Sequence, residues 1–391
     1  MRFPFTRARR QLRDVVELLF PPPRGTIEQA AVVMTPRAAR ASAVETFQLG
    51  SFTIPRLFTG LWQLSSSSWG SATTESQEAA LLCTIEHGLV AVDMADHYGD
   101  AELIYGEFRG KLAPEVQSTL YAATKWCIFS AISTPVTASF VLSGVRERCR
   151  RLGGRVDLLQ FHWYDYEAKE YLDVLVELVR LTKSHPELVA TIGLCNFDSE
   201  HVAEACEHLI AKTGSVGIVS NQVQFSLVDA RPLQGMVHTC EKYKVKLLAY
   251  GSLCGGFLSE RWLNQSAPEI YLESNQLTPS QRKYFDMIRS WDSCWDAFQD
   301  LLRCLSAAAS KYGVSISNVA TRWVLQQPAV GAVIVGTRLG VSEHIEDNLK
   351  TFGFELDTDE IDVVALGSLR EKMLSLFTML GDCGNEYRRL H

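Results

Sequence analysis

The sequence lacks the residue spacings that build metal centres and disulfide frameworks. Its ten cysteines are scattered through 391 residues, and no two of them form a CxxC pair. Its nine histidines include no HExxH arrangement. Zinc sites and small secreted domains depend on such spacings, and several of the cysteines fall inside predicted helices. We therefore predict no metal site and expect the thiols to remain reduced inside the cell.

An excess of positive charge and long apolar runs are lacking too. The formal net charge is −7 at pH 7, which argues against binding nucleic acid or an acidic membrane surface through bulk electrostatics. No unbroken apolar run is long enough to cross a bilayer. We therefore expect a cytoplasmic protein with neither nucleic acid nor membrane among its partners.

Residues 1–45 differ from the rest of the chain and are predicted to be a separate tail. The first thirteen residues contain five arginines and no acid, a composition typical of a mitochondrial targeting segment, which would comprise residues 1–33. Asp14 and Glu17 in the would-be helix that follows count against targeting. The alternatives are a disordered tail, or an extension upstream of a functional start at Met34.

Two common enzyme fingerprints are also missing. The sequence has no GxGxxG phosphate loop and no GxSxG motif. The first marks the dinucleotide site of Rossmann folds, and the second marks the nucleophile of many hydrolases. Their absence counts against a Rossmann dehydrogenase and against a barrel hydrolase.

What the sequence does contain is a regular alternation of strand-like and helix-like segments. Residues 47–54 alternate in polarity around a Gly-Ser turn, which predicts a small hairpin. The strands expected after it are 56–62, 90–94, 120–124, 156–161, 189–194, 218–222, 246–249 and 330–335. The helices expected with them are 75–87, 101–111, 135–152, 168–184, 199–212, 233–243 and 342–352. This pattern predicts an α/β fold, a (β/α)8 TIM barrel, in residues 46–370, followed by a C-terminal tail in residues 371–391.

One connection is too long for this pattern. Residues 252–311 follow the seventh strand, where an ordinary connection has only a few residues. The first half of this segment is polar and contains Pro268 and Pro279, so we expect a long loop there. Residues 294–312 are predicted to form a helix, and a further helix is expected between residues 314 and 327. A surface decoration without a role in the site is the alternative.

Ionisable side chains stand at the ends of three successive predicted strands. Asp93 lies at the end of the first of them, and Tyr98 follows in a polar loop. Lys125 and His162 end the next two. The carboxyl ends of parallel strands open onto one face of a barrel, so these four side chains are predicted to ring one mouth. Each of them alone would be an ordinary helix cap, rim residue or solvated strand end.

In this order the four residues resemble the catalytic tetrad of the aldo-keto reductases. The similarity runs from about Phe47 to about Leu369. It includes the segments Gly60-Leu61-Trp62-Gln63, Gly193-Leu194-Cys195-Asn196-Phe197, Asn221-Gln222-Val223-Gln224 and Gly336-Thr337-Arg338. The resemblance implies that Tyr98 gives a proton to a carbonyl oxygen as hydride arrives at the carbon. A nearby Lys125 ammonium would lower the pKa of Tyr98, Asp93 would hold Lys125, and His162 would donate a hydrogen bond to the substrate oxygen.

The resemblance also implies a nicotinamide cofactor, NADP(H). Asn196 and Gln222 resemble the amides that hold the nicotinamide carboxamide in this family. Tyr250 resembles the aromatic residue that stacks on the nicotinamide ring. Cys195 stands where many members have serine, so one hydrogen bond would come from a weak thiol donor.

The adenosine end of the cofactor is expected after the eighth strand. Arg338 matches a cation that the family places there, and Asp347 and Asn348 match an acid and an amide near the adenine. His344 occupies the position of a second arginine in many members. A guanidinium makes a paired contact with a 2′-phosphate, whereas a neutral histidine makes one hydrogen bond. We therefore expect NADPH to be preferred over NADH, less strongly than in members with both cations.

Aromatic residues near the predicted mouth suggest a substrate wall. The residues are Trp62, Trp126, Phe129 and Trp163, with Phe225 as a further candidate, although some of them would serve equally well as core residues. Such a wall would favour an aromatic or bulky apolar carbonyl compound.

We therefore expect the NADPH-dependent, reversible reduction of an aldehyde or ketone to an alcohol, with a small-molecule carbonyl as the substrate. The alternative is a barrel that binds the cofactor but acts as a regulatory or interaction subunit with little turnover, as channel-associated relatives of the family do. A test of turnover discriminates between the two.

Overall fold

The computed structural model describes residues 44–269, 277–290, 294–357, 359 and 369–388. These residues belong to one unit that spans residues 35–391. The predicted N-terminal tail, and any targeting segment in it, falls outside the described residues except for residues 44 and 45.

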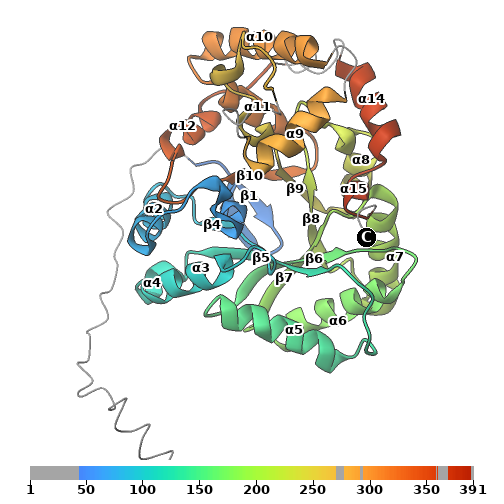
Figure 1. The fold of residues 1–391 in the computed structure, drawn as a ribbon. Coiled ribbons are helices and arrows are strands. Elements are labelled where there is room, and N and C mark those ends of the chain that lie inside the picture. Colours follow the sequence, from blue (N-terminus) through green and yellow to red (C-terminus); the bar gives the residue numbers. More distant parts are fainter. Residues whose placement is uncertain (1–43, 270–276, 291–293, 358, 360–368, 389–391) are drawn as a thin grey trace, which may run out of the picture. The chain divides into compact units, whose positions relative to one another are not determined.

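Eight parallel strands close into a barrel, as the sequence predicts (Figure 1). Their order is β10-β3-β4-β5-β6-β7-β8-β9, so each strand pairs with its neighbour along the chain and the last closes onto the first. The strands are β3 (Leu57–Gly60), β4 (Ala91–Asp93), β5 (Tyr121–Ile128), β6 (Val156–Trp163), β7 (Val189–Cys195), β8 (Ile218–Gln224), β9 (Lys246–Tyr250) and β10 (Val330–Gly336). The prediction of a (β/α)8 barrel is therefore confirmed.

Helices surround the barrel, and several begin at a side chain that caps the first turn. They are α2 (Thr74–Glu86), α3 (Ala101–Gly110), α4 (Pro114–Gln117), α5 (Ala138–Arg151), α6 (Glu170–Ser184), α7 (Ser199–Thr213), α8 (Met236–Tyr243), α11 (Ile316–Leu325) and α12 (Ile345–Leu349). Thr137 accepts a hydrogen bond from the backbone N–H of Phe140, so α5 starts three residues later than predicted. Asp198 caps α7 in the same way.

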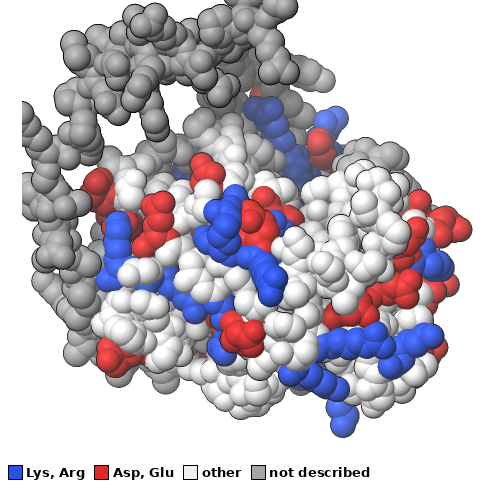
Figure 2. Space-filling model, turned by 90° about the horizontal axis from the view of Figure 1, so that it is seen from below, with Lys and Arg blue, Asp and Glu red and all other residues white. Residues whose placement is uncertain are grey.

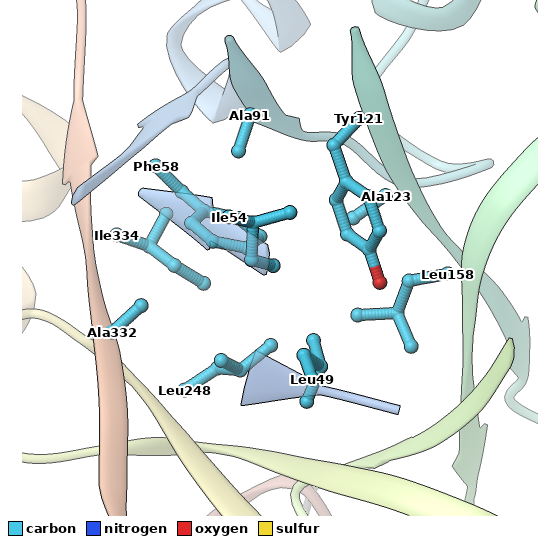
Figure 3. Close-up of a cluster of buried hydrophobic side chains, with 10 residues drawn as sticks. All are labelled: Leu49, Ile54, Phe58, Ala91, Tyr121, Ala123, Leu158, Leu248, Ala332 and Ile334. Carbon is cyan, nitrogen blue, oxygen red and sulfur yellow. The ribbon is translucent and has the colours of Figure 1, made fainter. Parts of the chain in front are cut away.

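The predicted hairpin closes the amino-terminal end of the barrel. Strands β1 (Thr46–Leu49) and β2 (Phe52–Pro55) pair antiparallel. Leu49 and Ile54 project from the hairpin into a cluster of buried side chains contributed by the barrel strands (Figure 3). The strand residues of this cluster are Phe58, Ala91, Tyr121, Ala123, Leu158, Leu248, Ala332 and Ile334. The lower half of the barrel interior is therefore packed apolar core.

The long connection after β9 contains more helix than the sequence predicts. Helix α10 (Cys294–Tyr312) has the predicted bounds. Helix α9 (Pro279–Arg289) lies in the part expected to be a loop. Its start is well defined, because Thr278 and Gln281 form a capping box around a proline at the first helical position. Two single-turn helices, Cys254–Gly256 and Glu260–Trp262, precede it.

Residues 371–391, predicted as a C-terminal tail, contain most of α14 (Leu369–Leu380) and all of α15 (Asn385–Arg388). Helix α15 is tied to the barrel by an ion pair in which both Glu386 carboxylate oxygens accept from Arg231, at 3.0 Å each. The chain therefore returns to the barrel after its eighth strand.

The surface is of mixed charge. On the face drawn in Figure 2, the basic and the acidic side chains are interspersed among uncharged residues. Within the described ranges, no helix has the length and apolar character needed to cross a membrane.

Candidate active site

Three of the four predicted catalytic side chains meet around the ammonium group of Lys125. Lys125 Nζ donates to Asp93 Oδ2 at 2.6 Å, to the carbonyl of Met94 at 2.9 Å and to Tyr98 Oη at 3.2 Å. Asp93 ends β4, Lys125 lies on the adjacent β5, and Tyr98 follows in the turn after β4. Neighbouring parallel strands therefore deliver these groups to one place, as predicted.

The other oxygen of Asp93 is also fully bonded. Gln160 Nε2 and Gln222 Nε2 each donate to Asp93 Oδ1 at 2.7 Å. Asp93 is 3% exposed and Lys125 is 2% exposed. A buried ion pair is tolerated when hydrogen bonds satisfy its remaining donors and acceptors. The sequence analysis did not identify Gln160. It lies two residues before His162 and therefore faces the same side of β6.

Burial and neighbouring charges together set the protonation of Tyr98 and Lys125. Burial raises the pKa of Tyr98, and the opposing effect of Lys125 is too small to reverse the shift. For Lys125, burial favours the neutral amine, but Asp93 and Tyr98 outweigh it and the pKa lies above its usual value. Lys125 does lower the pKa of Tyr98, as expected, but burial outweighs it and the net shift is upward. Tyr98 keeps its proton and Lys125 keeps its charge at neutral pH.

His162 lies further along β6 and is neutral. Burial lowers its pKa to about 3, and the positive charge of Arg388 acts in the same direction. Its ring packs against Phe129, with 5.3 Å between ring centroids. His162 Nδ1 is buried without a hydrogen-bond partner among the described residues. A neutral imidazole keeps one N–H, so this side chain is able to donate a hydrogen bond to a ligand.

The predicted aromatic wall is only partly assembled. Phe129 lies near the mouth, beside His162 and His97. Trp62 packs on Trp69 in the segment after β3, with 4.9 Å between ring centroids.

Trp126 and Trp163 face away from the mouth. Trp126 packs on Phe140 of α5, and Trp163 donates to the carbonyl of Ala168 on the outside of the barrel. Phe225 packs on Trp323 of α11. The reason is strand alternation: Lys125 and His162 point inward, so the residues next to them on β5 and β6 point outward.

Residues predicted for the nicotinamide lie together at the ends of β7, β8 and β9. Tyr250 Oη donates to Asn196 Oδ1 at 3.0 Å. Gln222 Nε2 donates to Asp93 and to Gln160 Oε1, so this amide belongs to the hydrogen-bond network around Asp93. Cys195 is buried beside them, and burial raises its pKa to about 12. Cys195 therefore remains a neutral thiol.

Residues predicted for the adenosine end lie after β10. Arg338 is exposed, and its Nε donates to Ser342 Oγ at 3.0 Å. His344 is exposed at the start of α12. Asp347 accepts from Ser315 Oγ at 2.9 Å, and Asn348 is partly buried on the same helix.

Orphaned polar atoms make the mouth suitable for a polar cofactor. Gln63 Oε1 is buried without a hydrogen-bond partner among the described residues, as is His162 Nδ1. Gln63 lies against Gly336 at the end of β10, where a Cβ would come within 2.2 Å of Gln63 Nε2. A buried polar atom without a partner is costly, and a ligand with donors and acceptors would remove that cost. The mouth therefore offers hydrogen-bonding groups to a polar cofactor such as a nicotinamide dinucleotide.

Sequence reasoning missed a group of residues that reach the mouth from outside the barrel strands. Tyr387 of α15 shares a hydrogen bond with Tyr250, with 3.0 Å between their hydroxyl oxygens. Lys283 of α9 donates to Tyr387 Oη at 2.6 Å. Arg388 Nη1 donates to the carbonyl of Asn196 at 2.8 Å. No spacing in the sequence marks these residues, because α9 and α15 meet only in the folded chain.

One grouping of metal-ligand types lies beside Tyr98. Donor atoms of Asp96, His97 and Cys127 lie within 4.8 Å of one another, the sole such group in the part of the chain that the structure describes. Asp96 already accepts from Arg148 Nη1 at 3.2 Å and from the backbone N–H of Cys127 at 3.0 Å. Asp96 therefore ties the loop after β4 to β5 and α5.

The chain as a whole is similar to known proteins. The sequence model of the Aldo/keto reductase family matches residues 56–365. A chloroplastic pyridoxal reductase of Arabidopsis thaliana is 25% identical over 335 residues, which cover 80% of this chain and 83% of the relative. The aldo-keto reductase YhdN of Bacillus subtilis is 23% identical over 303 residues, which cover 72% of this chain and 81% of the relative.

A solved structure has the same fold. It is a thermostable aldo-keto reductase in complex with the inhibitor epalrestat, and its similarity has a TM-score of 0.58 at 22% identity. The match covers 83% of this chain and 100% of that chain.

Proposed function

Because the chain belongs to the aldo/keto reductase family, we propose that it reduces an aldehyde or ketone to an alcohol with NADPH, and that Tyr98 is the general acid. The observation that carries the proposal is the position of Lys125 Nζ, which contacts both Asp93 and Tyr98 inside the barrel mouth. An ammonium so placed stabilises the negative charge that remains on the phenol when its proton leaves.

Each side chain of the group has one task in this reaction. Tyr98 donates its proton to the carbonyl oxygen, and Lys125 stabilises the phenolate that is left. Asp93, fixed by Gln160 and Gln222, holds Lys125 in place. His162 donates a hydrogen bond to the same oxygen and orients it.

The cofactor would be held at both ends of the mouth. Asn196, Gln222 and Tyr250 would hold the nicotinamide, and Cys195 would contribute at most a weak hydrogen bond. When bound, NADPH supplies the hydride. Arg338, with His344, would contact the 2′-phosphate, and Asp347 and Asn348 would lie near the adenine, so NADPH is preferred over NADH.

A turnover assay tests the proposal. NADPH oxidation is followed with a panel of aldehydes, ketones and quinones, while NADPH binding is measured separately by the change in its fluorescence. We expect oxidation that depends on the carbonyl compound. NADPH binding without turnover of any member of the panel would instead support a regulatory or interaction subunit.

We also propose a cytoplasmic location. Nine of the ten cysteines have described side chains, and all nine are free thiols. Free thiols are expected in a reducing compartment. Mitochondrial import would depend on residues 1–33. A fluorescent fusion of the full chain is expected to be cytoplasmic, and a mitochondrial signal that is lost when residues 1–33 are removed would identify a targeting segment instead.

A further inference from the structure

Lys283 of α9 is a cation that lies among tyrosine rings at the barrel mouth. Its Nζ lies 5.2 Å from the ring centroid of Tyr250, 5.5 Å from that of Tyr284 and 5.0 Å from that of Tyr387. Its hydrogen-bond acceptor is the neutral Tyr387 hydroxyl, at 2.6 Å. Lys283 nevertheless stays charged, because Tyr387 and its neighbours raise its pKa despite burial.

The group lies between the catalytic and the nicotinamide residues. Tyr387 Oη is 3.0 Å from Tyr250 Oη. On the other side, the ring of Tyr387 packs edge-on against His162, with 6.1 Å between ring centroids. Helices α9 and α15, which are far apart in the sequence, therefore meet over the mouth beside β9 (Figure 1).

The acid of the chain's last helix, Glu386, is held by another cation. Both oxygens of Glu386 accept from Arg231. Arg231 is 1% exposed and also donates to both oxygens of Asp229, at 2.8 Å each. This network fixes α15 against the barrel, and Glu386 acts on Lys283 as a nearby charge that raises its pKa.

A second cation fixes the end of α15. Arg388 Nη2 lies 3.4 Å from Asp198 Oδ2, and its guanidinium carbon lies 4.1 Å above the ring of Tyr166. The positive charge of Arg388 also acts on His162 at the mouth, where it helps to lower the pKa of the imidazole. Arg388 and Lys125 therefore both place positive charge near His162.

We propose that Lys283 and Tyr387 form an anion-binding subsite that receives a carboxylate or phosphate group of the carbonyl substrate. This inference rests on the proposed function, since it supplies the substrate class of that same reaction. Lys283 is partly exposed and has further N–H donors beyond the one given to Tyr387. A charge-assisted bond to a substrate anion would satisfy them, while the Tyr387 hydroxyl, which accepts from Lys283 and donates to Tyr250, holds the ammonium group in place.

The test compares two aldehydes that differ in one charge. 4-Carboxybenzaldehyde carries the anion, and methyl 4-formylbenzoate is its neutral ester. The ratio of their kcat/KM values is measured for the parent, for Lys283→Met and for Lys242→Met. Lys242 is the matched control, because it also lies over a tyrosine ring, at 4.6 Å from that of Tyr243, but on the exposed surface of α8.

We expect the parent to prefer the carboxylate and Lys283→Met to lose about ten-fold or more of that preference, the usual effect of one charged hydrogen bond. Lys242→Met should retain it. Tyr387→Phe keeps the ammonium and should lose less of the preference than Lys283→Met. An unchanged ratio in both variants at the mouth would overturn the proposal.

The cofactor's phosphates are the other anions that could occupy the subsite. NADPH affinity is therefore measured for each variant by fluorescence. A loss of NADPH affinity in Lys283→Met with an unaltered ratio of the two aldehydes would assign the subsite to the cofactor and overturn the assignment to substrate.

A binding experiment separates this inference from the proposed function. Benzoate and benzyl alcohol are titrated into protein saturated with NADP+, and binding is followed by tryptophan fluorescence. If no aldehyde is reduced, the proposed function fails. Tighter binding of benzoate that disappears in Lys283→Met would still support the anion subsite, and equal binding of the two probes to the parent would overturn it.

Discussion

The two ends of the barrel interior are built by the same strands with opposite kinds of side chain. Strand β5 contributes Tyr121 and Ala123 to the apolar cluster and then Lys125 to the site. Strand β6 contributes Leu158 to the cluster and then Gln160 to the site. Successive inward-facing residues of a strand are two positions apart, so one row of inward-facing side chains runs from the apolar cluster to the candidate active site. Stability and reactivity are thus separated along each strand and not between strands.

The difference shows what each end does for the protein. Burial of apolar side chains at the hairpin end stabilises the fold. At the mouth, burial of the ion pair Lys125–Asp93 carries a desolvation cost that its hydrogen bonds offset. Substitutions at the mouth should therefore change activity more than stability, and substitutions at the hairpin end should do the reverse.

The largest effect is expected for Tyr98→Phe. Loss of a general acid typically costs about 10²- to 10⁴-fold in rate, whereas the ring and its packing remain. Carbonyl reduction, NADPH affinity and melting temperature are measured together, and only the first should fall. Tyr105→Phe is the matched control, because the Tyr105 hydroxyl is buried without a partner among the described residues and lies outside the site. A Tyr98→Phe variant as active as the parent would refute the role of Tyr98.

The opposite end is tested by Leu158→Ala. Leu158 is fully buried in the apolar cluster, so its truncation should cost about 2–5 kcal/mol of unfolding free energy. Urea denaturation measures this loss, and kcat per folded molecule at low temperature should stay near that of the parent. Ile210→Ala on the exposed face of α7 is the control, since Ile210 is 45% exposed. A marked fall in kcat for Leu158→Ala would show that the two ends are coupled.

The neutral His162 predicts a pH dependence of stability. The folded state holds its pKa near 3, whereas the unfolded chain binds the proton below about pH 6.5. Stability should therefore fall as pH decreases from 6.5, by up to about 1.4 kcal/mol per pH unit from this residue. Urea denaturation of the parent and of His162→Asn at pH 8, 6 and 5 measures the effect. Equal slopes in the two proteins would contradict the buried neutral state of His162.

The smallest effect is expected for Arg338→Ala, because Arg338 lies after β10, apart from Asp93, Tyr98, Lys125 and His162. The variant should lose about ten-fold of the preference for NADPH over NADH, through loss of a charged contact with the 2′-phosphate. Affinities of both cofactors are compared with those of Arg303→Ala, an exposed arginine on α10. An unaltered preference in Arg338→Ala would exclude the role given to Arg338.

The strands and the catalytic group could be predicted because their signals are local. Asp93, Lys125 and His162 each end a short apolar run, and a parallel barrel brings such ends together. The same alternation places Trp126 and Trp163 on the outside, so their assignment to the mouth neglected information that the sequence holds. The capping box at Thr278 likewise marks the start of α9.

Other features of the site depend on tertiary structure. The pKa of Tyr98 is set by how deeply the phenol is buried, which no spacing reveals. The contact between Lys283 and Tyr387 joins segments 104 residues apart. Nothing in the composition of either segment indicates the other, so these residues become visible only when the chain is folded.

The anchoring of α15 through Arg231 has an evolutionary consequence. Asp93, Lys125 and His162 are strand residues and Tyr98 lies in the turn after β4, whereas the part of the mouth formed by Lys283 and Tyr387 comes from a connecting segment and from the last helix. Glu386 holds that helix through Arg231, a residue that makes no contact with the catalytic group. Substitutions at Lys283 therefore leave the strand residues of the site in place, so descendants of one such barrel could come to act on different compounds. Laboratory exchange of this residue would follow the same route.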